Sequence, residues 1–146
     1  MNHTPSVLFV CVKNAGKSQM AASLARMEVA KLEAAGGPHT EIYSAGTTPG
    51  KALNEDSRNA VEKLGATFAG ERPKAIDPGL LLNADRVILI GPEAQLEPVE
   101  GMRATIERWL PDEPSLRGIE GSERMELLTA DLHERVKALL RELHHS

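Results

Sequence analysis

The chain has 146 residues, one cysteine and a formal net charge of −4. This length supports one domain with its own core, which we expect over residues 1–146, and the negative charge disfavours general binding to nucleic acid or to an acidic membrane surface. No apolar stretch suffices to cross a bilayer, residues 1–5 do not begin a signal peptide, and a lone cysteine forms no internal disulfide, so we expect a cytoplasmic protein.

The first half of the chain predicts two strands with a helix between them. Residues 7–10 are continuously apolar, which is typical of a strand buried on both faces. Apolar residues then recur at helical spacing from residue 18 to about residue 33, and Gly36-Gly37-Pro38 ends that helix. Residues 41–44 form a short second strand, and the turn-rich stretch 45–50 follows.

The second half continues this alternation of helices and strands. We expect a helix from the N-cap Asn54 to Leu64 with a stop at Gly65, a short helix from Asp77-Pro78 to about Leu82, strands over 86–90 and 105–110, and a last amphipathic helix from Ser122 through Leu140. Such alternation indicates the α/β class, with a parallel sheet covered on both faces. Ligands bind beyond the carboxyl ends of strands in such sheets, and Cys11 lies at one of these ends.

The segment after the first strand combines an anion site with a nucleophile. Cys11 is followed by a loop that contains Gly16, Lys17 and Ser18, and a helix begins at once. Backbone N–H groups in such a loop and at a helix N-terminus attract anions, and they also favour the thiolate form of a nearby cysteine. A lone cysteine is commonly a small buried hydrophobe, but that role does not require this loop.

Gly16-Lys17-Ser18 also matches the end of a nucleotide-binding P-loop. In that motif a glycine stands at the position of Cys11, where a Cβ crowds the turn. The strand over 86–90 ends in Gly91-Pro92 and supplies no aspartate for magnesium. Both differences disfavour a nucleoside triphosphatase.

The loop resembles that of the low-molecular-weight tyrosine phosphatase superfamily, whose pattern is Cys, five residues, Arg, Ser. Gln19 stands where phosphatases usually have proline, so the likeness is greater to the arsenate reductase branch. It extends over almost the whole chain, through Ser44-Ala45-Gly46-Thr47, through residues 84–88 and through an acid loop at residues 109–114.

This resemblance implies a three-layer sandwich whose four-stranded parallel sheet has the order 2-1-3-4. It also implies that Cys11 is the nucleophile and that Ser18 donates a hydrogen bond to its thiolate. The alternative role of Ser18 is to cap the helix, and it could do both. The residues implied to bind the oxyanion are Val12, Lys13, Asn14, Ala15, Gly16 and Lys17. Asn14 tolerates the left-handed backbone that aims N–H groups into such a loop, but an ordinary turn asparagine would adopt the same conformation. Lys13 could equally face solvent.

Lys17 departs from the family pattern. Arginine offers a planar fork that holds two oxygens of a tetrahedral anion, whereas lysine offers a mobile point charge. The substitution is expected to weaken phosphatase activity more than anion binding.

The family places an aspartate beside a proline to protonate the leaving oxygen. Here Asp112 is the favoured match and Glu113 the substitute, and either needs a raised pKa to act as an acid at neutral pH. A turn or capping role is the alternative. The histidines show no metal-ligand spacing, so no metal is expected.

Thioredoxin-coupled arsenate reductases, which this chain resembles in the first loop, use two further cysteines. Because this chain has only Cys11, the second sulfur must come from outside. The resemblance therefore implies an arsenate–thiol transferase for arsenical resistance, with mycothiol as the favoured thiol, no tightly bound cofactor and a separate redoxin that reduces the thiol–arsenate adduct. A tyrosine phosphatase and a non-catalytic oxyanion-binding redox sensor are the rival hypotheses.

Overall fold

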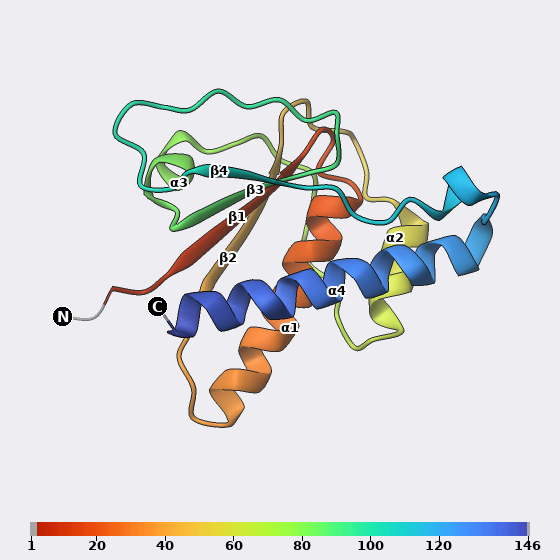
Figure 1. Cartoon of the computed structure of the whole chain (residues 1–146), viewed down its shortest axis with the longest axis horizontal. Helices are drawn as coiled ribbons and strands as arrows, with labels where there is room; N and C mark the ends of the chain where they lie inside the picture. The colour runs from red at the N-terminus through yellow and green to blue at the C-terminus, as the bar shows by residue number, and fades with distance from the viewer. Residues whose placement is uncertain (1–2, 146) are drawn as a thin grey trace.

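A parallel four-stranded sheet lies at the centre of the structure, a computed structural model that describes residues 3–145 (Figure 1). Met1 and Asn2 lie outside the described residues. They belong to the segment 1–5, which is not expected to begin a signal peptide. The strand order is β2-β1-β3-β4, which confirms the expected order. The strands are β1 (Ser6–Cys11), β2 (Glu41–Gly46), β3 (Arg86–Ile90) and β4 (Ile106–Trp109). Every strand pair is parallel, so the carboxyl ends of all four strands lie at one edge.

Alternate residues of the central strands face two different layers. Val7 and Phe9 of β1 pack in the larger core with the helices α1, α2 and α4, whereas Leu8 and Val10 pack in a second core. That second core is covered by α3 and by the long segment between β3 and β4 (Figure 1). Both faces of the sheet are therefore covered, as the continuous apolar runs predict.

The helices agree closely with the sequence pattern. They are α1 (Lys17–Ala34), α2 (Glu55–Glu62), α3 (Pro78–Asn83) and α4 (Gly121–His145), with a 3-10 helix η1 (Pro114–Arg117) before the last. Asn54 caps α2 by accepting a hydrogen bond from Ser57 N at 2.8 Å. Asp77 caps α3 in the same way. The capping predictions are confirmed.

The differences lie at element ends. Helix α2 ends at Glu62, short of Leu64, because the chain turns toward Gly65, whose φ of +99° suits glycine. Helix α4 extends beyond Leu140 to His145, so the amphipathic pattern underestimates its length. Strand β4 is one residue shorter at each end than expected.

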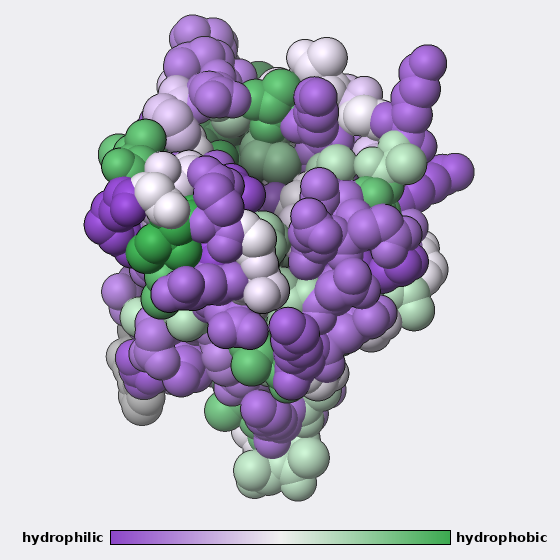
Figure 2. Space-filling view, turned by 90° about the vertical axis from the view of Figure 1, so that its right-hand side faces the viewer, coloured by the Kyte–Doolittle hydropathy of each residue, from purple (hydrophilic) through white to green (hydrophobic). Residues whose placement is uncertain are grey.

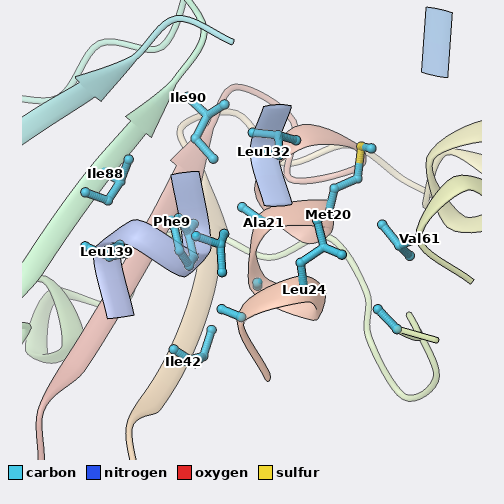
Figure 3. Close-up of a cluster of buried hydrophobic side chains, with 14 of the residues drawn as sticks. Phe9, Met20, Ala21, Leu24, Ile42, Val61, Ile88, Ile90, Leu132 and Leu139 are labelled. Carbon is cyan, nitrogen blue, oxygen red and sulfur yellow. The ribbon is translucent and has the colours of Figure 1, made fainter. Parts of the chain in front are cut away.

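The larger core fixes α1 and α4 against the sheet. Figure 3 shows Phe9 and Ile88 of the sheet near Leu139 of α4. Leu132 of α4 lies closer to Ile90 of β3 and Met20 of α1 in the same cluster. All six side chains are at most 2% exposed. This packing holds the start of α1 rigidly at the end of β1. Within the described residues, no helix is both long enough and apolar enough to span a membrane.

Candidate active site

The loop between β1 and α1 is held from outside by the segment that follows β2. Four of its carbonyl oxygens accept backbone hydrogen bonds from that segment. The bonds run from Thr47 N to Cys11 O (3.0 Å), from Thr48 N to Val12 O (2.8 Å), from Gly50 N to Lys13 O (2.9 Å) and from Asn54 N to Ala15 O (2.8 Å). The loop carbonyls are thus turned outward and satisfied.

The loop N–H groups consequently face the other way. In a trans peptide the C=O of one residue and the N–H of the next point in opposite directions, and the described residues contain no cis peptide. The N–H groups of Val12, Lys13, Asn14 and Gly16 therefore face away from the outer segment. The N–H of Asn14 shows where this inner side lies, because it donates to Cys11 Sγ at 3.3 Å. The backbone thus forms a concave set of donors around the sulfur.

Asn14 is the centre of the hydrogen bonds that fix this loop. Its φ is 54°, the left-handed conformation that the sequence analysis expects. The side chain is completely buried, and its Oδ1 accepts from Gln19 Nε2 and from the backbone N of Lys74, both at 3.0 Å. Its Nδ2 donates to Ser18 Oγ at 2.8 Å.

Ser18 connects Asn14 to the cysteine by hydrogen bonds. Because its oxygen already accepts from Asn14, the hydroxyl proton is free to be donated to Cys11 Sγ, which lies 2.9 Å away. Two donors, Ser18 Oγ and Asn14 N, are thus aimed at the sulfur, an arrangement that stabilises a thiolate. The N-cap of α1 is Gly16, without a side-chain cap bond, so the alternative capping role of Ser18 is wrong.

Cys11 is mostly buried but not sealed. Its residue is 8% exposed, and it lines two cavities of about 160 and about 270 Å³. A water molecule occupies about 30 Å³ of the liquid, so either cavity has room for an anion of five heavy atoms. The alternative of a cysteine shut within the apolar core is wrong.

Two lysines of the loop line both cavities. Lys13 is exposed, so the solvent-facing position considered in the sequence analysis is correct, but it still borders the site. Lys17 is half-buried, and a Cβ added to Gly91 would lie 3.8 Å from its Nζ. The ammonium group therefore lies beside the end of β3, on the cavity side of the loop.

The two proposed acids are paired with arginines. Asp112 accepts from Arg117 at 2.6 and 3.1 Å, and this hydrogen bonding lowers the pKa of Asp112. The pKa of Glu113 is lowered to about 2, chiefly by hydrogen bonds from Arg124. The charge of Lys17 is one of the further causes. Neither carboxyl group lines the two cavities, and neither has the raised pKa that a general acid needs at neutral pH.

The structure adds residues that the sequence analysis did not select. Arg124 and Asp56 line the larger cavity, and Glu93 lines the smaller one. Lys74 holds Asn14 through its backbone and also places Nζ 3.1 Å from Ser44 Oγ. None of these residues carries a local motif, so only tertiary contact reveals them. Within the described residues, no cluster of three His, Cys, Asp or Glu side chains is arranged to hold a metal ion.

A model of the low molecular weight phosphotyrosine protein phosphatase family matches residues 6–145. The chain belongs to this family. Membership agrees with the loop geometry and with the sheet order, and it rules against the nucleotide P-loop interpretation.

Members of the family with different activities are similar to this chain. An arsenate reductase of Bacillus licheniformis is 31% identical over 111 residues, covering 75% of this chain and 74% of that protein. The structure of an arsenate reductase in the phosphate binding state has a TM-score of 0.76 at 23% identity and covers 95% of this chain and 98% of that one. A low molecular weight protein tyrosine phosphatase from T. tengcongensis has a TM-score of 0.70 at 20% identity, with coverage of 95% and 99%. The chain is accordingly an enzyme with cysteine-based chemistry of the arsenate reductase and phosphatase kind.

Proposed function

We propose that this enzyme is an arsenate reductase that transfers arsenate to a small external thiol, with mycothiol as the favoured thiol. The observation that supports this most is the sulfur of the chain's only cysteine, held among inward-facing N–H groups beside Lys17. The similarity to the arsenate reductase of Bacillus licheniformis favours arsenate over other tetrahedral oxyanions.

In the first step arsenate binds to the loop amides and to Lys17, and the Cys11 thiolate attacks arsenic. An As–S bond forms, one As–O bond breaks, and that oxygen leaves as water after it takes a proton. We assign the proton to Asp112, which has to separate from Arg117 before its pKa can rise. Glu113, the substitute, has to separate from Arg124 in the same way. Arsenic remains in the +5 state.

In the second step the external thiolate attacks the enzyme-bound arsenic. The Cys11–arsenic bond breaks, so the Cys11 thiolate is regenerated and a thiol–arsenate adduct leaves. A redoxin thiol then attacks the sulfur of that adduct, arsenic receives the electron pair and departs as arsenite, and a mixed disulfide remains. No tightly bound cofactor is required.

The single cysteine is the reason for an external thiol. An internal disulfide needs a second sulfur, and the chain has none. Small thiols reach high concentrations in a reducing compartment, so this chemistry suits the cytoplasm and would serve arsenic detoxification.

A purified mixture of enzyme, arsenate, mycothiol and a mycothiol-specific redoxin tests the proposal by the arsenite it releases. We expect release that depends on every component and is abolished by Cys11→Ser. Parallel reactions with bacillithiol, glutathione and thioredoxin identify the reductant. Absence of Cys11-dependent arsenite with mycothiol, bacillithiol and glutathione would contradict the proposal, also where thioredoxin supports release.

A tyrosine phosphatase is the second candidate, favoured by the family that the chain matches. It predicts rapid hydrolysis of an aryl phosphate without added thiol. Lys17 lacks the fork that grips a phosphoryl group in its transition state, so we expect this hydrolysis to be slow in the natural chain and faster in Lys17→Arg. A redox sensor, in contrast, predicts oxyanion binding with no turnover of either substrate.

A further inference from the structure

The loop of this enzyme lacks a guanidinium group, but the structure supplies one from the far end of the chain. Arg124 is the fourth residue of α4. It lines the same cavity of about 270 Å³ as Cys11 and Lys17. A planar fork is therefore present at the site although the family's loop position for it is occupied by lysine.

Arg124 is held in place by a bidentate ion pair. Its Nε and Nη2 donate to the two oxygens of Glu113, each at 2.9 Å. Among residues 3–145, the only hydrogen-bond partner of its Nη1 is Met125 Sδ, at a long 3.9 Å. Glu113 thus fixes the plane of the guanidinium and leaves N–H donors of Nη1 free to bind another acceptor.

The charges around this cavity suit an anion. Lys13, Lys17 and Arg124 bring three positive charges to its lining, and Asp56 brings one negative charge. The carboxylate of Glu113, which is paired with Arg124, offsets one of these positive charges, so that one net positive charge remains at the cavity. The local positive excess contrasts with the net charge of −4 of the whole chain.

We propose that Arg124 binds the tetrahedral oxyanion above Cys11 through Nη1, with Glu113 as its positioning residue. The inference rests on the oxyanion-binding part of the proposed function. It assigns the guanidinium that the loop lacks to α4, so that completion of the site depends on an element more than 100 residues from the loop.

Calorimetric titration with inorganic phosphate tests this assignment without arsenate or thiol. We expect Arg124→Ala to weaken phosphate binding by about tenfold or more, because hydrogen bonds to charged groups contribute most among polar contacts. Arg124→Lys keeps the charge and the partner Glu113 but loses the fork, so we expect an intermediate affinity. Urea unfolding of each variant shows that it is folded.

Arg117→Ala is the matched control. Arg117 also makes a bidentate ion pair, with Asp112, in the same part of the chain, but it does not line the cavity. Its removal changes the net charge equally and is expected to alter phosphate affinity by less than about twofold. Equal losses in Arg117→Ala and Arg124→Ala, or unchanged affinity in Arg124→Ala, would overturn the assignment. Phosphate binding that depends on Arg124 without any arsenite release would instead support the assignment and contradict the proposed function alone.

Discussion

At the scale of single residues, the nucleophile depends on one asparagine. Asn14 combines a left-handed backbone with a buried side-chain amide. Both the oxygen and the nitrogen of this amide form hydrogen bonds. The oxygen accepts from Gln19 and Lys74, which fixes the orientation of the amide, and the nitrogen then has to donate to Ser18. The direction of the hydrogen bond from Ser18 to Cys11 follows from this arrangement.

Asn14→Asp tests this direction. Aspartate keeps the size and tolerates the same backbone, but it accepts the Ser18 proton that otherwise points at Cys11 and also buries a negative charge beside the sulfur. We expect carbamidomethylation of Cys11 by iodoacetamide at pH 7 to slow by at least about tenfold, and the free energy of unfolding to fall by roughly 1–3 kcal/mol.

The control for this change is Asn83→Asp. Asn83 is exposed and donates to Gly79 O within α3, away from Cys11. We expect it to leave the labelling rate unchanged. A wild-type rate in Asn14→Asp would show that the Ser18 proton does not control the reactivity of the thiol.

Local sequence reveals only part of this site. Cys11, Asn14 and Ser18 lie within eight residues and could be assigned from the loop pattern. Gln19 marks the arsenate reductase branch in the sequence, but the pattern does not predict that it is completely buried and bonded to Asn14. The contact from Lys74 spans 60 residues, and no periodicity predicts such a contact.

At the scale of elements, the loop depends on close approach of β2. A Cβ added to Gly46 would lie 2.7 Å from Val12 O and 3.0 Å from Asn14 N, both backbone atoms. Only glycine allows β2 to support the loop at this distance. This explains in physical terms why a glycine follows Ala45 at the end of the strand.

We expect Gly46→Ala to displace the loop and to lower the free energy of unfolding by about 1–3 kcal/mol, as overpacking does in a core. Phosphate binding should weaken in the same variant. Gly50→Ala is the control, because its Cβ would meet Lys13 Cβ at an ordinary 3.5 Å. Equal unfolding free energies and equal phosphate affinities for the two variants would contradict this view of the loop.

Helix α4 holds the acid segment through side chains. Glu113 pairs with Arg124, Asp112 N donates to Asp131 Oδ2 at 2.5 Å, and the Leu110 carbonyl accepts from Arg135. The segment that follows β4 is therefore attached to a helix that also lines the cavity.

The Glu113–Arg124 pair gives a pH dependence of stability. The pKa of Glu113 is lowered from 4.5 to about 2 in the folded protein. The contribution of the ion pair to the free energy of unfolding is therefore complete above pH 4.5. It is lost as the pH falls from 4.5 toward 2, because Glu113 becomes protonated. Urea unfolding should show wild type more stable than Glu113→Gln at pH 7, with a difference that shrinks as the pH falls below 4.5.

Glu123→Gln on the same helix serves as the control, because Glu123 is exposed. We expect its stability to follow that of wild type at every pH. A constant difference between wild type and Glu113→Gln from pH 7 to pH 3 would contradict the ion-pair account.

The sequence predicts the helices and strands themselves better than the residues at which they begin and end. The strand over residues 86–90 agrees with β3 at both ends, because charged Asp85-Arg86 precedes its apolar residues and Gly91-Pro92 follows them. The end of α4 was missed, because the residues after Leu140 are mostly polar and only Leu143 among them packs against the larger core.

At the scale of the whole molecule, a cavity with positive charge lies beside Cys11 on a protein whose net charge is negative. The face that carries α2 and the start of α4 is mainly hydrophilic (Figure 2). The loop contributes cations to the cavity from the amino-terminal part of the chain, and α4 contributes Arg124 from the carboxyl-terminal part. Any preference for anions is consequently local and not a result of the net charge.

The sheet order could not be derived from periodicity. Patterns of apolar residues place strands along the chain, but strand pairing is a contact between distant segments. The order 2-1-3-4 was available because the loop and the later motifs together resembled one family. The α/β class itself follows from the alternation of elements alone.

The central claim is that the loop binds a tetrahedral oxyanion directly against the Cys11 sulfur. Because Cys11 is the only cysteine, the intact mass of iodoacetamide-treated protein reports modification at that atom. The account predicts that arsenate and phosphate slow this modification in a saturable manner, while chloride at equal ionic strength does not. A modification rate that stays the same at every arsenate concentration would contradict it.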